Sequence, residues 1–114
     1  MKSLRKFLTL GAQRDGSTVA SYRRPLGYQQ LTLTGSAQKL TLPTLTGGQS
    51  VGYVVIQCEG TSAGARWRDD GTAPSATVGM ILSTGQELDY SGDPTAIQFI
   101  IQTGSPIINI SYYM

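Results

Sequence analysis

The sequence contains no histidine, a single cysteine and few charged residues, and each shortage excludes a class of function. Without histidine, His-based catalytic triads, imidazole general bases and histidine-ligated metal sites are excluded. Because Cys58 is the only cysteine, the chain cannot form an internal disulfide. Its place in the apolar run YVVIQC predicts a buried, inert thiol. No run of about 18 apolar residues is present, so no transmembrane helix is encoded.

Charged residues make up 14% of the 114 residues, and they are unevenly distributed. Residues 1–24 contain six basic residues and one acidic residue, whereas residues 25–114 contain three basic and six acidic residues. We therefore expect a basic N-terminal arm, residues 1–30, in front of a mildly acidic domain, residues 31–114. The arm favours an acidic protein surface over nucleic acid, because no basic face and no nucleic-acid-binding motif continues into the domain.

From residue 31 onward, short runs that alternate or are rich in β-branched residues are separated by turn residues. The predicted strands cover residues 31–34, 38–42, 52–59, 65–70, 77–82, 86–90, 96–102 and 106–114. Parallel α/β architecture is disfavoured, since no stretch between strands shows a helical period. The pattern predicts an all-β fold, an antiparallel β-sandwich or jelly-roll-like domain with an extended N-terminal arm.

The stretch ARWRDDGTAP gathers the only tryptophan, two arginines and two aspartates, and it is the best candidate for a site. In an alternating strand, Trp67 points to one face while Arg66 and Arg68 point to the other. The two arginines could then pair with Glu87 and Asp89 on an adjacent strand. Two interpretations stay open: a strand that leads into a turn, or a planar surface that holds a glycan or a protein partner.

The aspartates of this stretch do not predict catalysis. Glycosidases need two carboxylates flanking a bond in a cleft, and Ca²⁺ needs about six to eight oxygen ligands. Asp69 and Asp70 lie in the turn sequence DDG, where either can cap the Gly71 turn through an Asx hydrogen bond. We therefore expect no catalytic residue, no metal and no cofactor.

The C-terminal half of the chain resembles a family of small virion proteins of tailed bacteriophages. The resemblance rests on ARWRDDGTAP followed by GM, then GQELDY, GD, AIQFI and a terminal NISYY, at Ala65–Pro74, Gly79–Met80, Gly85–Tyr90, Gly92–Asp93, Ala96–Ile100 and Asn109–Tyr113. Residues 1–50 carry no corresponding motif. The resemblance implies a structural protein of the particle and no enzyme activity.

Within that class, we expect a capsid decoration or cement protein on the exterior of the phage head, bound to the major capsid protein and homo-oligomeric, with a trimer favoured. The alternative is a head-fibre, neck or tail attachment module that binds a glycan or receptor. Neither hypothesis involves a membrane, and a nucleic-acid partner is not expected. The candidate partner-binding residues are Lys2, Arg5, Lys6, Arg14, Arg23 and Arg24 in the arm, and Arg66, Trp67 and Arg68 in the domain.

Overall fold

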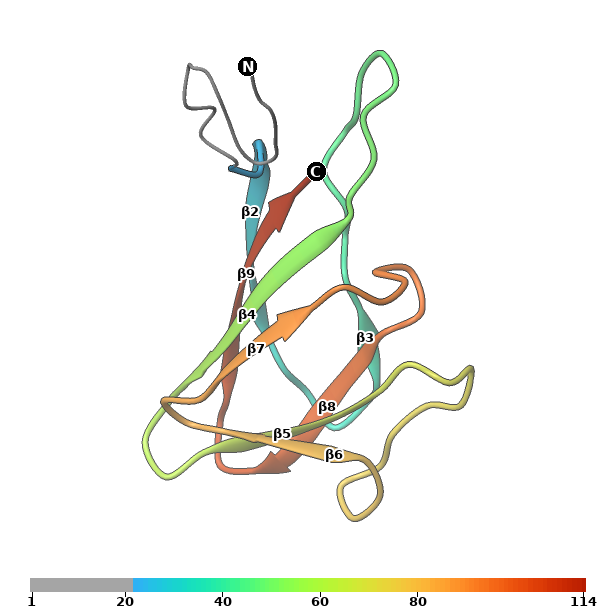
Figure 1. Ribbon diagram of the computed structural model, residues 1–114. Coiled ribbons are helices and arrows are strands. Elements are labelled where there is room, and N and C mark those ends of the chain that lie inside the picture. Colours follow the sequence, from blue (N-terminus) through green and yellow to red (C-terminus); the bar gives the residue numbers. More distant parts are fainter. Residues whose placement is uncertain (1–21) are drawn as a thin grey trace, which may run out of the picture.

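Eight strands and no helix make up the part of the protein that the structure, a computed structural model, describes: residues 22–114 (Figure 1). The strands are β2 (Pro25–Thr32), β3 (Gln38–Lys39), β4 (Tyr53–Glu59), β5 (Gly64–Arg68), β6 (Met80–Ser83), β7 (Glu87–Tyr90), β8 (Gln98–Thr103) and β9 (Ile107–Tyr113). Each strand overlaps one of the runs predicted from the sequence, so the all-β prediction is confirmed. Within these residues no helix is long and apolar enough to cross a membrane.

The last four strands pair with the first four in reverse order. β2 pairs with β9, β3 with β8, β4 with β7 and β5 with β6, all antiparallel. This long ribbon is rolled up, since β4 also pairs with β9 and β5 with β8. The result is two four-stranded sheets, β2-β9-β4-β7 and β3-β8-β5-β6 (Figure 1). A double-sheet antiparallel ribbon of this kind is a jelly roll.

Side chains that alternate along the central strands fill the space between the sheets. In the first sheet, Ile56 of β4 lies opposite Ile110 of β9, and both are fully buried. The second sheet contributes Phe99 of β8, which is also fully buried. Cys58 is 1% exposed, which confirms the predicted buried thiol. The other buried members of the core are Leu33, Leu40, Val54, Ala65, Leu82, Tyr90, Ile97, Ile108 and Tyr112.

The domain begins earlier than the sequence predicted. Residues 25–30, assigned above to the N-terminal arm, belong to β2 and pair with β9, so the boundary at residue 30 is wrong. The run showed no apolar alternation because one of its inward side chains is polar. Gln29 accepts hydrogen bonds at Oε1 from the Tyr112 hydroxyl at 2.7 Å and from the Thr41 amide at 3.1 Å. A glutamine satisfied in this way can replace an apolar residue in the interior.

Candidate functional site

The predicted site residues lie in three places. Lys2, Arg5, Lys6 and Arg14 are outside the residues that the structure describes. Arg23 and Arg24 directly precede β2 of the first sheet, whereas Arg66, Trp67 and Arg68 lie on β5 of the second sheet (Figure 1). The structure therefore brings Arg66–Arg68 together on one strand but does not join them to Arg23 and Arg24 in one surface.

Arg23 closes the end of the first sheet. Its guanidinium lies 4.5 Å from the centre of the Tyr53 ring, and Nη1 donates a hydrogen bond to the Met114 carbonyl at 3.2 Å. The Arg24 carbonyl accepts a hydrogen bond from the Met114 amide at 2.9 Å. These contacts join the residues that precede β2 to the last residue of the sequence. Arg23 therefore has a structural role in addition to any role in docking.

The strand β5 alternates as predicted, but its arginines have other partners. Trp67 is half-buried, packs against the core and meets the Tyr90 ring edge-on, with the ring centres 6.2 Å apart. The predicted pairing of the two arginines with Glu87 and Asp89 is wrong, because those carboxylates lie on β7 in the first sheet. The sequence gives the face of each side chain but not which strand becomes its neighbour.

Arg66 anchors the long loop between β5 and β6. Its Nε donates to the Ala76 carbonyl at 3.0 Å and its Nη1 to the Gly79 carbonyl at 2.8 Å. The loop therefore returns to the outer face of the second sheet, where Ile100 of β8 pairs with Arg66 and is only 8% exposed. Because both bonds run to backbone carbonyls of its own chain, Arg66 is a scaffold residue rather than a free docking cation.

The loop has a defined shape at its returning end. Ser75 and Val78 exchange backbone hydrogen bonds of 2.9 and 3.3 Å, and the Ser75 hydroxyl also accepts from the Val78 amide at 3.0 Å. Gly79 has φ 142°, and a Cβ there would lie 3.1 Å from the Trp67 carbonyl oxygen and 3.2 Å from the Pro74 Cβ. Only glycine suits this position. The motif residues thus build a loop that holds Val78 at the surface.

Asp69 and Tyr90 connect this loop to the core. The Tyr90 hydroxyl donates to Asp69 Oδ2 at 2.8 Å, and a second contact of 3.1 Å joins it to the Asp93 carbonyl. Burial, and then the hydrogen bond to Asp69, raise the pKa of Tyr90 far above its usual range. The phenol is therefore a permanent donor that holds Asp69 in place.

Asp70 is held by Arg68. The guanidinium forms two parallel bonds to the carboxylate, Nε to Oδ1 at 3.0 Å and Nη2 to Oδ2 at 2.6 Å. This contact keeps the pKa of Asp70 below its usual range. Asp70 Oδ1 also lies 3.5 Å from the Thr72 amide, at the spacing expected of an Asx turn. Residues 22–114 contain no group of three or more side chains that could hold a metal ion.

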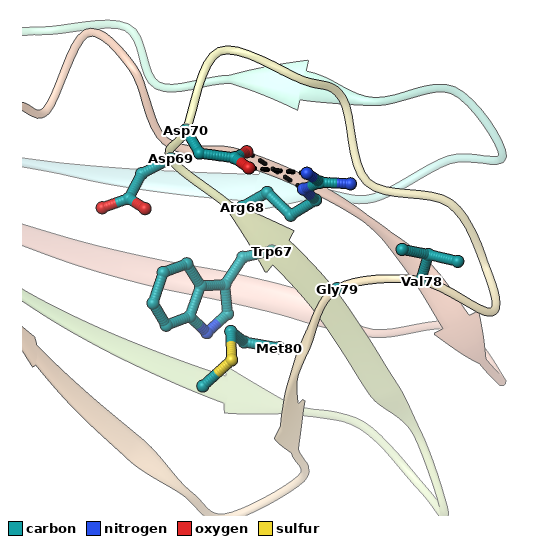
Figure 2. Close-up of a pocket in the computed structure, with 7 residues that line it drawn as sticks. All are labelled: Trp67, Arg68, Asp69, Asp70, Val78, Gly79 and Met80. Carbon is teal, nitrogen blue, oxygen red and sulfur yellow. Dashed lines mark hydrogen bonds and ion pairs between the residues drawn. The ribbon is translucent and has the colours of Figure 1, made fainter.

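A groove of about 390 Å³ opens beside these residues (Figure 2). Figure 2 shows the Trp67 indole next to the Met80 side chain, with Val78 farther along the returning loop, beyond Gly79. Trp67 and Met80 are cross-strand neighbours, which explains their contact. The complete lining is Trp67, Arg68, Asp69, Asp70, Val78, Gly79 and Met80. An apolar floor with a charged rim is suited to binding.

The sequence missed the apolar members of this surface. Val78, Met80 and Ile81 are 53%, 60% and 51% exposed, although they belong to a run, residues 77–82, that was predicted as an ordinary strand. Met80 and Ile81 are exposed because β6 is the last strand of the second sheet and pairs only with β5, whereas Val78 lies in the loop that precedes β6. Strand order is not encoded in a local pattern, so alternation alone could not identify this edge.

The strands of the two sheets carry opposite charge. Those of the first sheet contain carboxylates and no lysine or arginine, and those of the second contain cations and no aspartate or glutamate. The residues are Glu59, Glu87 and Asp89 in the first sheet, and Lys39, Arg66 and Arg68 in the second. Charge of this kind restricts how copies and partners can approach the domain.

Comparison with known proteins found no match: no family model matches the chain, and neither the curated proteins nor the solved structures include a significant match.

Proposed function

We propose that this chain is a structural component of a tailed-phage particle, a decoration or cement protein of the head exterior. The observation that carries the proposal is the Trp67 groove, which is lined by the exposed apolar residues Val78 and Met80. All of them come from the stretch that resembles phage virion proteins. Large exposed apolar side chains grouped around a groove mark surfaces that another protein covers.

The fold is consistent with this role. Jelly rolls occur in viral capsid domains and also in lectins, so the fold alone does not decide between a shell contact and a glycan contact. The basic segment at residues 1–24 supplies charge for docking on an acidic surface such as the major capsid protein. Weak contacts of this kind become strong when many copies bind a symmetric shell, which favours a homo-oligomer such as a trimer.

Binding to particles tests the proposal. Particles of the phage that encodes the chain, lacking this protein, are incubated with the wild type, with a deletion of residues 1–21, and with Met80→Glu. The deletion ends before Arg23, so the contact of Arg23 with Tyr53 is kept. We expect both variants to cosediment at least tenfold less than the wild type.

Tyr28→Ala serves as the matched control for this assay. Tyr28 is 65% exposed, like Met80, but lies on β2 at the far edge of the first sheet. Its replacement should leave cosedimentation unchanged. Equal binding of the wild type and the residue 1–21 deletion would show that the arm does not dock on the shell.

A head-fibre, neck or tail attachment module that binds a glycan or receptor is the second candidate. The observation that favours it is the aromatic floor of the groove beside the polar rim of Arg68, Asp69 and Asp70. Arg66 is not available for this contact, since it is bonded to the loop. In this case Met80→Glu would leave assembly intact and abolish binding to the host cell surface.

A further inference from the structure

The free edge of β6 lacks the features that usually protect a sheet edge. Three of the six large hydrophobic residues exposed in the described part of the chain, Val78, Met80 and Ile81, lie on or next to this strand. β6 has the sequence MILS, with no charge and no proline, and its outer side is paired with no strand of residues 22–114. Proteins normally block such edges with charges, proline or a covering segment. We therefore expect another polypeptide segment to cover this edge.

The groove beside the edge defines the chemistry of what covers it. Trp67, Val78 and Met80 form an apolar wall, and Asp69 and Asp70 lie on the rim. Only one cation, Arg68, lines the groove, so its three charged side chains sum to one net negative charge. An apolar side chain flanked by lysine or arginine satisfies both parts of the surface.

The chain itself contains a segment with this chemistry. Residues Leu4–Leu8, LRKFL, interleave apolar and basic side chains, and the first ten residues include three basic and no acidic ones. We propose that residues Leu4–Leu8 of one copy of this chain bind in the Trp67 groove of a second copy. The apolar side chains contact Trp67 and Met80, and the basic ones face the aspartates of the rim.

Chain length favours a second copy over the same molecule. Phe7 and Tyr22 are fifteen positions apart in the sequence, and a random-coil chain of that length would span about 21 Å on average, with an upper limit of roughly 50 Å. The chain enters β2 at one end of the molecule, whereas β5 and β6, which carry Trp67 and Met80, lie at the other end (Figure 1). A neighbouring copy can place the segment without stretching it around the body.

Exchange of arms also explains how an oligomer would close. Each copy supplies one arm and one groove, which is a head-to-tail contact that generates rings, including a trimer. The inference rests on the proposed function and deepens it by naming the partner of residues 4–8. Because the exchange builds the oligomer whose many copies bind the shell, Met80→Glu and the arm deletion weaken particle binding through loss of the oligomer. The shell itself is contacted by Arg14, Arg24 and strand edges. It concerns the isolated protein, so its test is separate from particle binding.

Complementation between two variants tests the exchange in solution. Phe7→Ala/Leu8→Ala keeps the groove but impairs the arm, and Met80→Glu keeps the arm but blocks the groove. Mass is measured by sedimentation for the wild type, for each variant and for their equimolar mixture. We expect the wild type to be a multiple of 12.2 kDa, each variant alone to be a monomer, and the mixture to contain one copy of each.

The single tryptophan gives an independent signal. Trp67 lines the groove, so its emission should shift to longer wavelength when Phe7→Ala/Leu8→Ala removes the bound arm. Tyr28→Ala is the control and should change neither mass nor emission. Thermal unfolding verifies that Met80→Glu is folded, and Val78→Glu, at another exposed residue that lines the groove, replaces it if it is not.

Three results would overturn the inference. A wild type that stays monomeric, or a mixture that stays monomeric, excludes exchange between copies. If the oligomer persists in Phe7→Ala/Leu8→Ala but is lost in Met80→Glu, a different part of the neighbouring copy, not the arm, covers the edge. If complementation succeeds and particle binding fails, the proposed function is wrong and the arm exchange stands.

Discussion

Replacement of Arg66 by alanine is the sharpest test of how the loop is held. The substitution removes two hydrogen bonds from a charged donor, 3.0 Å to the Ala76 carbonyl and 2.8 Å to the Gly79 carbonyl. Such bonds contribute about 1.5–3 kcal/mol each to stability. The bond to Ala76 is exposed to solvent and contributes less than the part-buried bond to Gly79. We therefore expect Arg66→Ala to lower the free energy of unfolding by about 2–3 kcal/mol.

Arg68 provides the matched control, because it lies two residues away on the same strand and carries the same charge. Its partner is the exposed Asp70, so Arg68→Ala should change the free energy of unfolding little. Urea unfolding measures both variants. Hydrogen exchange should also show faster exchange of the Val78 amide, which is bonded to Ser75, in Arg66→Ala alone. If the two variants have the same free energy of unfolding, and the Val78 amide exchanges at the wild-type rate in both, Arg66 does not hold the loop.

Three further predictions concern the core, the loop and the pH dependence. Ile108→Ala should cost about 3 kcal/mol in urea unfolding, because Ile108 is fully buried between the sheets; a loss under 1 kcal/mol contradicts this. Gly79→Ala should destabilise by about 2 kcal/mol because φ is positive and a Cβ meets the loop, whereas Gly35→Ala, with nothing within 4 Å, should be neutral. Burial raises the pKa of Tyr112 from 10.0 to about 12. The resulting stability is complete below pH 10 and is lost as pH rises toward 12, so Tyr112→Phe should flatten the fall in stability measured over this range.

Local sequence patterns predicted the strands well because each strand carries its own signal. β4 and β9 alternate between buried and more exposed positions along their whole length, and turn residues separate them from their neighbours. β2 was the exception, since Gln29 points inward and replaces an apolar residue with a hydrogen-bonded amide. A partner 83 residues away supplies that bond, and no local pattern can reveal it.

The candidate site was predicted in part. The sequence correctly separated Trp67 from the flanking arginines, because side-chain direction follows from alternation. It failed on the partners of Arg66, which lie in a loop whose path depends on the glycine at position 79. The exposure of Met80 was also missed. It results from the position of β6 at the edge of the second sheet, which a local pattern does not reveal.

The loop that carries the resemblance to virion proteins has a physical explanation in this fold. Arg66, Asp69 and Gly79 are each fixed by contacts within the chain, and their common effect is to hold Val78 and Met80 at an open edge. A rigid apolar edge loses little entropy on binding. The motif therefore positions Val78 and Met80 as the proposed contact surface requires.

A density map of the phage particle, resolved well enough to place this domain, tests the central claim most directly. The account expects the jelly roll on the outside of the head, in contact with the capsid shell and with Trp67 and Met80 covered by protein. A domain located at a fibre or tail tip with the Trp67 groove open to solvent, or absent from the particle, would contradict it.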